Sequence, residues 1–244
     1  MRMAAILVLL LAAALPAPAA ERCTAPRDLT AASDSFPHAA RAAAQKRRLG
    51  VLVVGSASTT GSGTSAPDNV YPARLQEALR TLLPGTEVEV TPRGGRGLTA
   101  PDLLKVLEQA LPEVKPDLVI WQTGTVDAVR GLDPDLFAAT LVAGFVKVTE
   151  ARADLVLIDM QFSRFGRAAM NYGAYREAMQ AVAAAAPNGM LFRRYDLMRY
   201  WAETGQVDVE RAPRAAWPRE TDRLHACLGK ALAETVVEGM RLSR

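Results

Sequence analysis

The chain has 244 residues, and its Lys and Arg residues exceed its Asp and Glu residues by only three. The basic residues are scattered along the chain without interleaved aromatic residues, so we expect no nucleic-acid partner, which would need a clustered basic face. The sequence contains two His and two Cys. These are too few for a typical zinc site, and we expect neither a metal nor an organic cofactor.

The first twenty residues have the pattern of a signal peptide. A short basic start is followed by the apolar stretch 4–15 and then by small residues and prolines. The stretch is shorter than the roughly 20 apolar residues of a membrane-spanning helix. We therefore expect cleavage near Ala19 or Ala20, a periplasmic or secreted protein, and no stable membrane insertion. The charged residues just before Cys23 argue against a lipoprotein, whose lipobox needs small or apolar side chains there.

The two cysteines, Cys23 and Cys227, lie near opposite ends of the exported chain. Cysteines of an exported protein can pair, and this favours a disulfide. Closing so long a loop contributes roughly 4 to 5 kcal/mol in the chain-entropy model. The alternative is two unpaired cysteines, one of them buried on the last helix.

Apolar runs rich in Val, Leu and Ile alternate with segments of helical periodicity. The predicted strands span 49–54, 87–90, 118–121, 155–159 and 190–192. The predicted helices span 71–83, 100–111, 134–150, 172–186 and 224–242, with an added helix at 37–48 and an irregular region at 197–220. This alternation predicts a mainly parallel sheet with helices on both faces. We divide the chain into a signal peptide (1–20), an N-terminal extension with a helix (21–48) and one α/β domain (49–244).

Ligands of open parallel sheets bind beyond the carboxyl ends of the strands, so the loops after the strands are the place to look for a site. The run of small residues at 55–63 follows the first strand and lacks the Gly-Lys-Ser/Thr of a phosphate loop. Segments 92–99 and 122–127 follow the second and third strands, and the C-terminal part carries Asp222-Arg223-Leu224-His225.

These four blocks, in this order on an alternating α/β chain, resemble the SGNH/GDSL hydrolases over almost all of the exported chain. The resemblance implies a flavodoxin-like three-layer α/β/α sandwich with a five-stranded parallel sheet in the order 2-1-3-4-5. It also implies hydrolysis of carbohydrate or lipid esters in the cell envelope. The family's first block reads Gly-Asp-Ser-x-Thr, and many exported members resemble Gly-Ser-Ser-Ser-Thr. Here the block reads Gly55-Ser56-Ala57-Ser58-Thr59, which puts Ala57 at the position of the nucleophile.

The resemblance implies a role for each matching residue. His225 matches the general base and Asp222 the carboxylate that orients it. Gly97, with Thr99 just beyond it, matches the backbone donor to the oxyanion. The family's third block, Gly-x-Asn-Asp, supplies a second donor from its Asn, but Val126 stands there, between Gly124 and Asp127.

Three hypotheses follow from the missing nucleophile and oxyanion donor. The chain could be an esterase that recruits Ser56 or Ser58 as its nucleophile. It could instead be a non-catalytic pseudoenzyme that binds a small-molecule or glycan ester. The third hypothesis is a structural or partner-binding role, for which the sequence offers no discrete feature. Asp159 and Gln161 could line the site or serve as a turn cap and a solvated side chain. Four aromatic residues of the late region could stack on sugars, although ordinary packing is the favoured interpretation: Tyr195, Tyr200, Trp201 and Trp217. The sequence leaves the oligomeric state open.

Overall fold

The computed structural model describes residues 23–165 and 172–243, so the predicted signal peptide and its cleavage site lie outside the described residues. The five strands are β1 (Arg48–Gly55), β2 (Glu87–Gly94), β3 (Leu118–Gln122), β4 (Asp154–Ile158) and β5 (Gly189–Phe192). All pairings are parallel, and the strand order is β2-β1-β3-β4-β5, which confirms the predicted topology.

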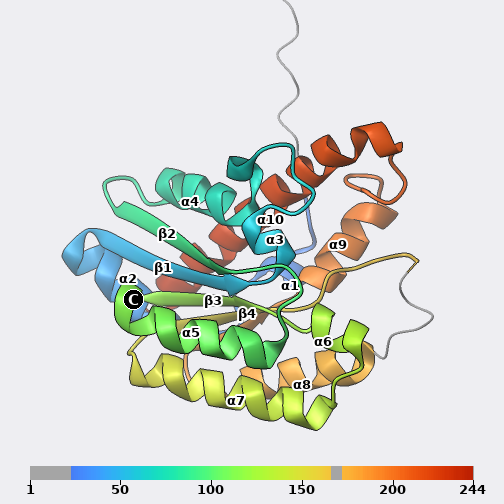
Figure 1. The fold of residues 1–244 in the computed structure, drawn as a ribbon. Helices are drawn as coiled ribbons and strands as arrows, with labels where there is room; N and C mark the ends of the chain where they lie inside the picture. Colours follow the sequence, from blue (N-terminus) through green and yellow to red (C-terminus); the bar gives the residue numbers. More distant parts are fainter. Residues whose placement is uncertain (1–22, 166–171, 244) are drawn as a thin grey trace, which may run out of the picture.

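Helices cover both faces of the sheet, as expected for strands that are buried on both sides (Figure 1). Helices α4 (Tyr71–Leu82) and α10 (Trp217–Leu242) pack together on one face. Helices α5 (Ala100–Val114), α7 (Pro134–Glu150) and α8 (Tyr172–Ala185) form the layer on the other face. The shorter helices are α1 (Arg27–Thr30), α2 (Pro37–Arg41), α3 (Ala57–Thr60), α6 (Thr125–Arg130) and α9 (Arg194–Glu203).

Several element boundaries differ from the prediction. In place of the helix expected at 37–48, the structure has the short helix α2, which ends at Arg41. A π-helical turn, Ala42–Lys46, follows it directly. Strand β2 runs on to Gly94, so the second block begins inside a strand. The region expected to be irregular, 197–220, contains most of α9, and α10 begins at Trp217 rather than at 224. Asp222 and His225 therefore both lie on α10, whereas the predicted helix at 224–242 included only His225.

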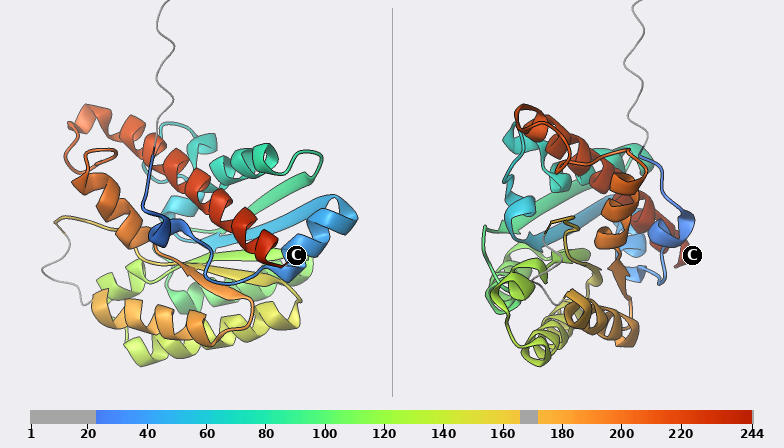
Figure 2. Two further views of the ribbon diagram at one scale, coloured as in Figure 1. Left: turned by 180° about the vertical axis from the view of Figure 1, so that it is seen from behind. Right: turned by 90° about the vertical axis from the view of Figure 1, so that its right-hand side faces the viewer.

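The N-terminal segment is part of the same core as the sheet. Phe36 is fully buried, and its backbone N–H donates to the Gly239 carbonyl of α10 at 3.1 Å. The Ala39 N–H donates to the Asp154 carboxylate at the start of β4, at 2.9 Å. Figure 2 shows this segment running alongside α10. The stretch 23–48 thus packs against both α10 and the sheet.

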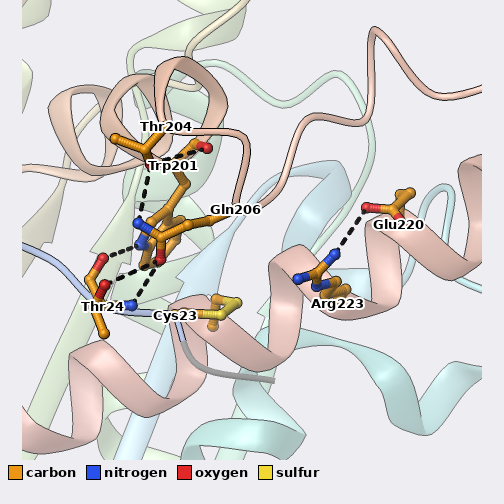
Figure 3. Close-up of a disulfide and its surroundings, with 8 residues drawn as sticks. Cys23, Thr24, Trp201, Thr204, Gln206, Glu220 and Arg223 are labelled. Carbon is orange, nitrogen blue, oxygen red and sulfur yellow. Dashed lines mark hydrogen bonds and ion pairs between the residues drawn. A yellow bond between two sulfur atoms is a disulfide. The ribbon is translucent and has the colours of Figure 1, made fainter. Parts of the chain in front are cut away.

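Cys23 and Cys227 form a disulfide that joins the N-terminal segment to α10 across 204 residues of sequence. Next to it, Thr24 accepts a 3.0 Å hydrogen bond from the Trp201 indole and donates its own N–H to Gln206 at 2.8 Å (Figure 3). The predicted pairing is therefore present, and it is compatible with an exported protein. None of the helices among the described residues is long and apolar enough to cross a bilayer.

Candidate functional site

A cavity of about 290 Å³ opens beyond the carboxyl ends of the strands, where a doubly wound sheet binds ligands. We call it the elbow pocket, because the turn after β1 forms part of its wall. Its lining comes from α3, the segment after β4, α9, the loop at 207–210 and α10. The lining residues are Ala57, Ser58, Ser62, Gln161, Phe162, Arg194, Met198, Ala202, Val207, Asp208, Val209, Glu210, Thr221, Leu224, His225 and Leu228. The first-block turn and the C-terminal histidine thus meet at one pocket.

The turn after β1 is tight, and glycine is needed on both sides of it. A side chain on Gly55 would overlap Thr59 Oγ1, and one on Gly94 at the end of β2 would overlap the Gly55 carbonyl oxygen. The Gly95 N–H donates to that same carbonyl at 3.2 Å, which holds the second-block loop against the turn. Helix α3 begins immediately after the turn, at Ala57. The methyl group of Ala57 therefore lines the pocket at the position the family resemblance assigns to a nucleophile.

The two serines beside Ala57 lie in different surroundings. Ser56 is buried in the turn. Ser58 lines the pocket, donates its hydroxyl proton to Gln122 Oε1 at 2.9 Å, and accepts a hydrogen bond from Arg194 Nη1 at 3.3 Å. Both the proton and a lone pair of Ser58 are thus already engaged.

A backbone N–H at the start of α4 holds the His225 ring in place. Its Nδ1 accepts the N–H of Tyr71 at 2.9 Å. A neutral imidazole has one N–H and one acceptor nitrogen, so an Nδ1 acceptor puts the ring proton on Nε2. Burial lowers the pKa of His225 to about 4, and the positive charge of Arg194 adds to this, whereas Asp222 raises the pKa. At neutral pH the ring is therefore an uncharged hydrogen-bond donor at Nε2.

Asp222 lies one helical turn before His225 on α10, but its carboxylate binds elsewhere. It accepts hydrogen bonds from the N–H and the hydroxyl of Ser65 and from the Asn69 side chain. In a serine-hydrolase triad the aspartate accepts from Nδ1–H of the histidine. Here that nitrogen is occupied by a backbone donor, and Asp222 fastens the loop after α3 to α10.

The second and third blocks follow β2 and β3, the two strands that flank β1, and are joined by Asp127. Its fully buried carboxylate accepts from the Ala100 N–H at 2.7 Å and from the Gly124 N–H at 3.2 Å. Thr99 caps α5 and donates its hydroxyl to Asp102 at 2.7 Å. The side-chain hydrogen bonds of Thr99 and Asp127 thus stay within the third block and the start of α5.

The two oxyanion positions of the sequence prediction lie in these two blocks. Gly97 has φ +80°, a backbone conformation that favours glycine. Val126 is half-buried in the first turn of α6 and offers an aliphatic side chain where the family resemblance expects an amide. The substrate contacts expected of Gly97, Thr99, Gly124, Val126 and Asp127 stay predictions.

Arg194 is the pocket residue that sequence reasoning missed. It is 3% exposed and lines the pocket beside Ser58 and His225. Burial lowers the pKa of its guanidinium. Its position was a usable signal, because Arg193-Arg194 directly follows the fifth strand, at the ligand-binding edge of the sheet.

Asp159 and Gln161, singled out after the fourth strand, have different environments. Asp159 is fully buried and accepts the Tyr195 N–H at 2.7 Å, which places the start of α9. Burial raises its pKa to about 6. Gln161 lines the elbow pocket. Asp159 thus positions α9, and Gln161 is a candidate ligand contact.

The late aromatic residues mostly pack inward. Trp201 is fully buried and Tyr195 is buried, whereas Tyr200 is half-buried and Trp217 is exposed. Trp217 donates its indole N–H to the Ala212 carbonyl at 2.8 Å. Packing, the favoured interpretation of the sequence, accounts for Trp201 and Tyr195. Among residues 23–165 and 172–243, no group of three or more His, Cys, Asp or Glu side chains could hold a metal ion.

The parallel sheet in the order β2-β1-β3-β4-β5, the tight turn after β1 and the pocket beyond the strand ends define a doubly wound α/β protein of the lipase-like class. Within that class the chain belongs to the non-GDSL lipase-like family, whose model matches residues 22–242. No curated protein matches the chain in sequence.

Solved structures show the same fold at low sequence identity. A two-domain esterase (CEX) active on acetylated mannans is 15% identical, with a TM-score of 0.64 over 86% of this chain and 55% of its own. TesA is 24% identical, with a TM-score of 0.55 over 73% of this chain and 97% of its own. A putative lipolytic G-D-S-L protein from Desulfitobacterium hafniense DCB-2 is 17% identical, with a TM-score of 0.58 over 78% of this chain and 99% of its own.

Proposed function

We propose that this chain is a non-catalytic member of its family that binds a ligand in the elbow pocket. One observation carries the proposal: His225 accepts the Tyr71 N–H at Nδ1, in a pocket where a methyl group stands for the nucleophile. We further propose that it works in the periplasm or outside the cell, since it has a signal-peptide pattern and a disulfide. The expected ligand is a small molecule or glycan with an acyl group.

The protonation of His225 is what argues against ester hydrolysis. A serine esterase needs the lone pair of Nε2 to take the proton of the attacking hydroxyl. With Nδ1 acting as acceptor, Nε2 holds the proton of the neutral ring and can only donate. The low pKa of His225 makes the ring a weak base as well.

The rate losses that follow from the two missing groups also argue against ester hydrolysis. Loss of the serine nucleophile costs roughly a millionfold in turnover in the subtilisin example, and loss of one oxyanion donor roughly a hundred- to a thousandfold. These effects are not additive, but either would disable an esterase. Ala57 and Val126 combine both losses.

A second candidate function is hydrolysis with Ser58 as a substitute nucleophile. The observation in its favour is that Ser58 lines the pocket with a cationic group, Arg194, on its oxygen. Against it, the hydroxyl proton of Ser58 is donated to Gln122. A nucleophile must instead give its proton to a base.

Hydrolysis of a chromogenic short-chain ester separates the two functions. We expect the wild-type protein to release no chromophore above the buffer rate. Ala57→Ser combined with Val126→Asn returns the two missing groups but leaves the Tyr71 N–H on Nδ1 of His225, so this variant should also release no chromophore above the buffer rate. Hydrolysis by the double variant that disappears when His225→Ala is added would show that His225 accepts a proton at Nε2 despite this hydrogen bond. Wild-type turnover that is abolished by Ser58→Ala and by His225→Ala would refute the non-catalytic function.

A further inference from the structure

Arg194 is a buried cation that forms no ion pair within residues 23–165 and 172–243; burial lowers its pKa, and the nearby Asp159 opposes this. Among the described residues no ion pair reaches it, and the one hydrogen bond it makes goes from Nη1 to the Ser58 hydroxyl at 3.3 Å. Its Nε is buried and unpartnered. Burying an unpaired charge is costly, so such groups in proteins normally have a counter-ion.

Asp159, whose charge acts on Arg194, and Asp196, two residues further along the chain, both pair with other arginines. Asp159 pairs with Arg176 at 3.4 Å. Asp196 pairs with Arg176 at 2.7 Å and with Arg193 at 2.8 Å. Arg176, Arg193 and Arg199 thus take the ion pairs of these two carboxylates, and none of these pairs includes Arg194.

The surroundings of Arg194 strengthen its need for an anion. On one side the apolar residues Ile158, Phe192 and Leu232 share a small void with it, which keeps water away from the guanidinium. On the other side it faces the elbow pocket. Charge interactions are stronger in such low-dielectric surroundings than in water. An anion that enters the pocket would meet a cation with little competing solvent.

The other groups of the pocket limit what that anion can be. One guanidinium, the Ser58 hydroxyl and the Nε2–H of a neutral His225 offer a single positive charge and neutral polar groups. Asp208 and Glu210, which also line the pocket and are bonded to Arg164, disfavour a doubly charged ligand. The remaining wall is largely aliphatic or aromatic: Phe162, Met198, Val207, Val209, Leu224 and Leu228.

We propose that the elbow pocket binds a monocarboxylate with a short aliphatic chain, whose carboxylate pairs with the Arg194 guanidinium. The proposal rests on the non-catalytic function and specifies its ligand as a free acid rather than an ester. The cavity of about 290 Å³ is at the lower end of the size range of small-molecule sites. An esterase with this cation beside its nucleophile would retain its acid product, whereas a binding protein gains affinity from the same charge.

Calorimetric titration of the disulfide-bonded protein at pH 7.5 tests the proposal with three probes: hexanoate, methyl hexanoate and inorganic phosphate. We expect hexanoate to bind at least tenfold more tightly than the methyl ester or phosphate. Arg194→Met should weaken hexanoate binding about ten- to a hundredfold, the usual effect of losing a charge-assisted hydrogen bond. The control Arg193→Met removes a neighbouring arginine that pairs with Asp196, and it should leave the affinity within about twofold.

Thermal unfolding of each variant shows separately whether it is folded. Arg194→Met should raise the Tm, because an apolar side chain of similar volume replaces an unpaired buried charge. The charge-retaining variant Arg194→Lys should keep part of the preference for hexanoate over the ester. Equal affinity for hexanoate and methyl hexanoate, preferred binding of phosphate, no binding at millimolar concentrations, or unchanged hexanoate affinity in Arg194→Met would each overturn the proposal.

The same titration keeps the two proposals apart. Hydrolysis of methyl hexanoate by the wild-type protein would refute the non-catalytic function and would not alter the measured preference for the acid. Binding of the intact ester alone would refute the carboxylate site and leave the non-catalytic function standing.

Discussion

At the elbow pocket, one backbone hydrogen bond decides what the imidazole of His225 can do. Its sequence position matches that of a general base, and it lies beside the turn after β1, as the block order predicted. The hydrogen bond from the Tyr71 N–H could not be predicted, because it depends on how α4 packs against α10. The same limit applied to Arg194, whose burial and lack of a counter-ion arise only from packing. The sequence could name some residues of the pocket, His225 and Ser58 among them, but not their hydrogen-bond partners.

A second buried group, Asp154, should make stability depend on pH. Oδ2 accepts the Ala39 N–H at 2.9 Å, whereas Oδ1 is buried without a partner among the described residues. Burial raises the pKa of Asp154 to about 7, and the negative charges of Asp117 and Asp34 add to this, whereas hydrogen bonds from the backbone N–H groups of His38 and Ala39 lower it. In the unfolded chain an aspartate has a pKa of about 3.9. Between these values the folded state holds the proton more tightly, so this contribution to stability is present below about pH 4 and is lost as the pH rises through 7.

Asp154→Asn removes this titration and keeps an acceptor for the Ala39 N–H. We expect the wild-type free energy of unfolding, relative to that of the variant, to fall between pH 4 and 7 by at most about 1.4 kcal/mol per pH unit. Urea unfolding of both proteins across that range measures the difference. The opposite trend caused by the low pKa of His225 occurs in both proteins and cancels. A difference that does not vary with pH would show that Asp154 is ionised in the folded state.

At the scale of elements, the prediction was most accurate for the strands, because an apolar run directly indicates a buried strand. Strands β1, β3, β4 and β5 are short apolar runs buried on both faces, and all five strands and their order were predicted. Helix α9 was missed because it buries polar residues, Arg194 and Asp196 among them, and so shows no clear apolar stripe. The early start of α10 was missed because its first two turns, from Trp217, are mostly polar. Polar helices that border a site are the elements whose sequence pattern is least informative.

The position of α10, and hence of His225, depends on close contact with α4 at Gly229. A Cβ at this position would lie 2.6 Å from Arg74 Cβ and 2.7 Å from the Leu75 backbone nitrogen. Ala is normally better than Gly in a helix by about 1 kcal/mol, but overpacking of this kind costs about 1 to 3 kcal/mol and should dominate. We expect Gly229→Ala to lower the free energy of unfolding and the control Lys230→Ala, on the exposed face, to change it by less than about 0.5 kcal/mol. Chemical denaturation measures both. An unchanged or raised stability in Gly229→Ala would mean that the two helices can move apart freely.

At the scale of the whole molecule, the elbow pocket combines segments from both halves of the chain. Its lining comes from the helix after the β1 turn, near the start of the chain, and from α9 and α10, near its end. The block order alone was enough to bring these segments together, because parallel strands all end at the same edge of the sheet. The N-terminal extension was predicted as a separate segment ahead of the domain, yet it shares the core and is bonded to α10 by the disulfide. Contacts between the chain ends leave little pattern in the sequence beyond the two cysteines.

Residues 23–48 should therefore be required for folding. Without them α10 would lose its disulfide partner and the fully buried Phe36, and the Asp154 carboxylate would lose its hydrogen bond from Ala39. Losing a buried Phe costs about 3 to 5 kcal/mol and losing a native disulfide typically 2 to 5 kcal/mol, which together approach the whole stability of a domain. We expect a chain of residues 49–244 to lack a cooperative thermal transition, whereas residues 23–244 fold and unfold cooperatively. Replacing both cysteines by serine in the longer chain separates the two effects, since it removes the disulfide and keeps the buried segment. A cooperative transition in the 49–244 chain would mean that the extension is an addition to a domain that folds by itself.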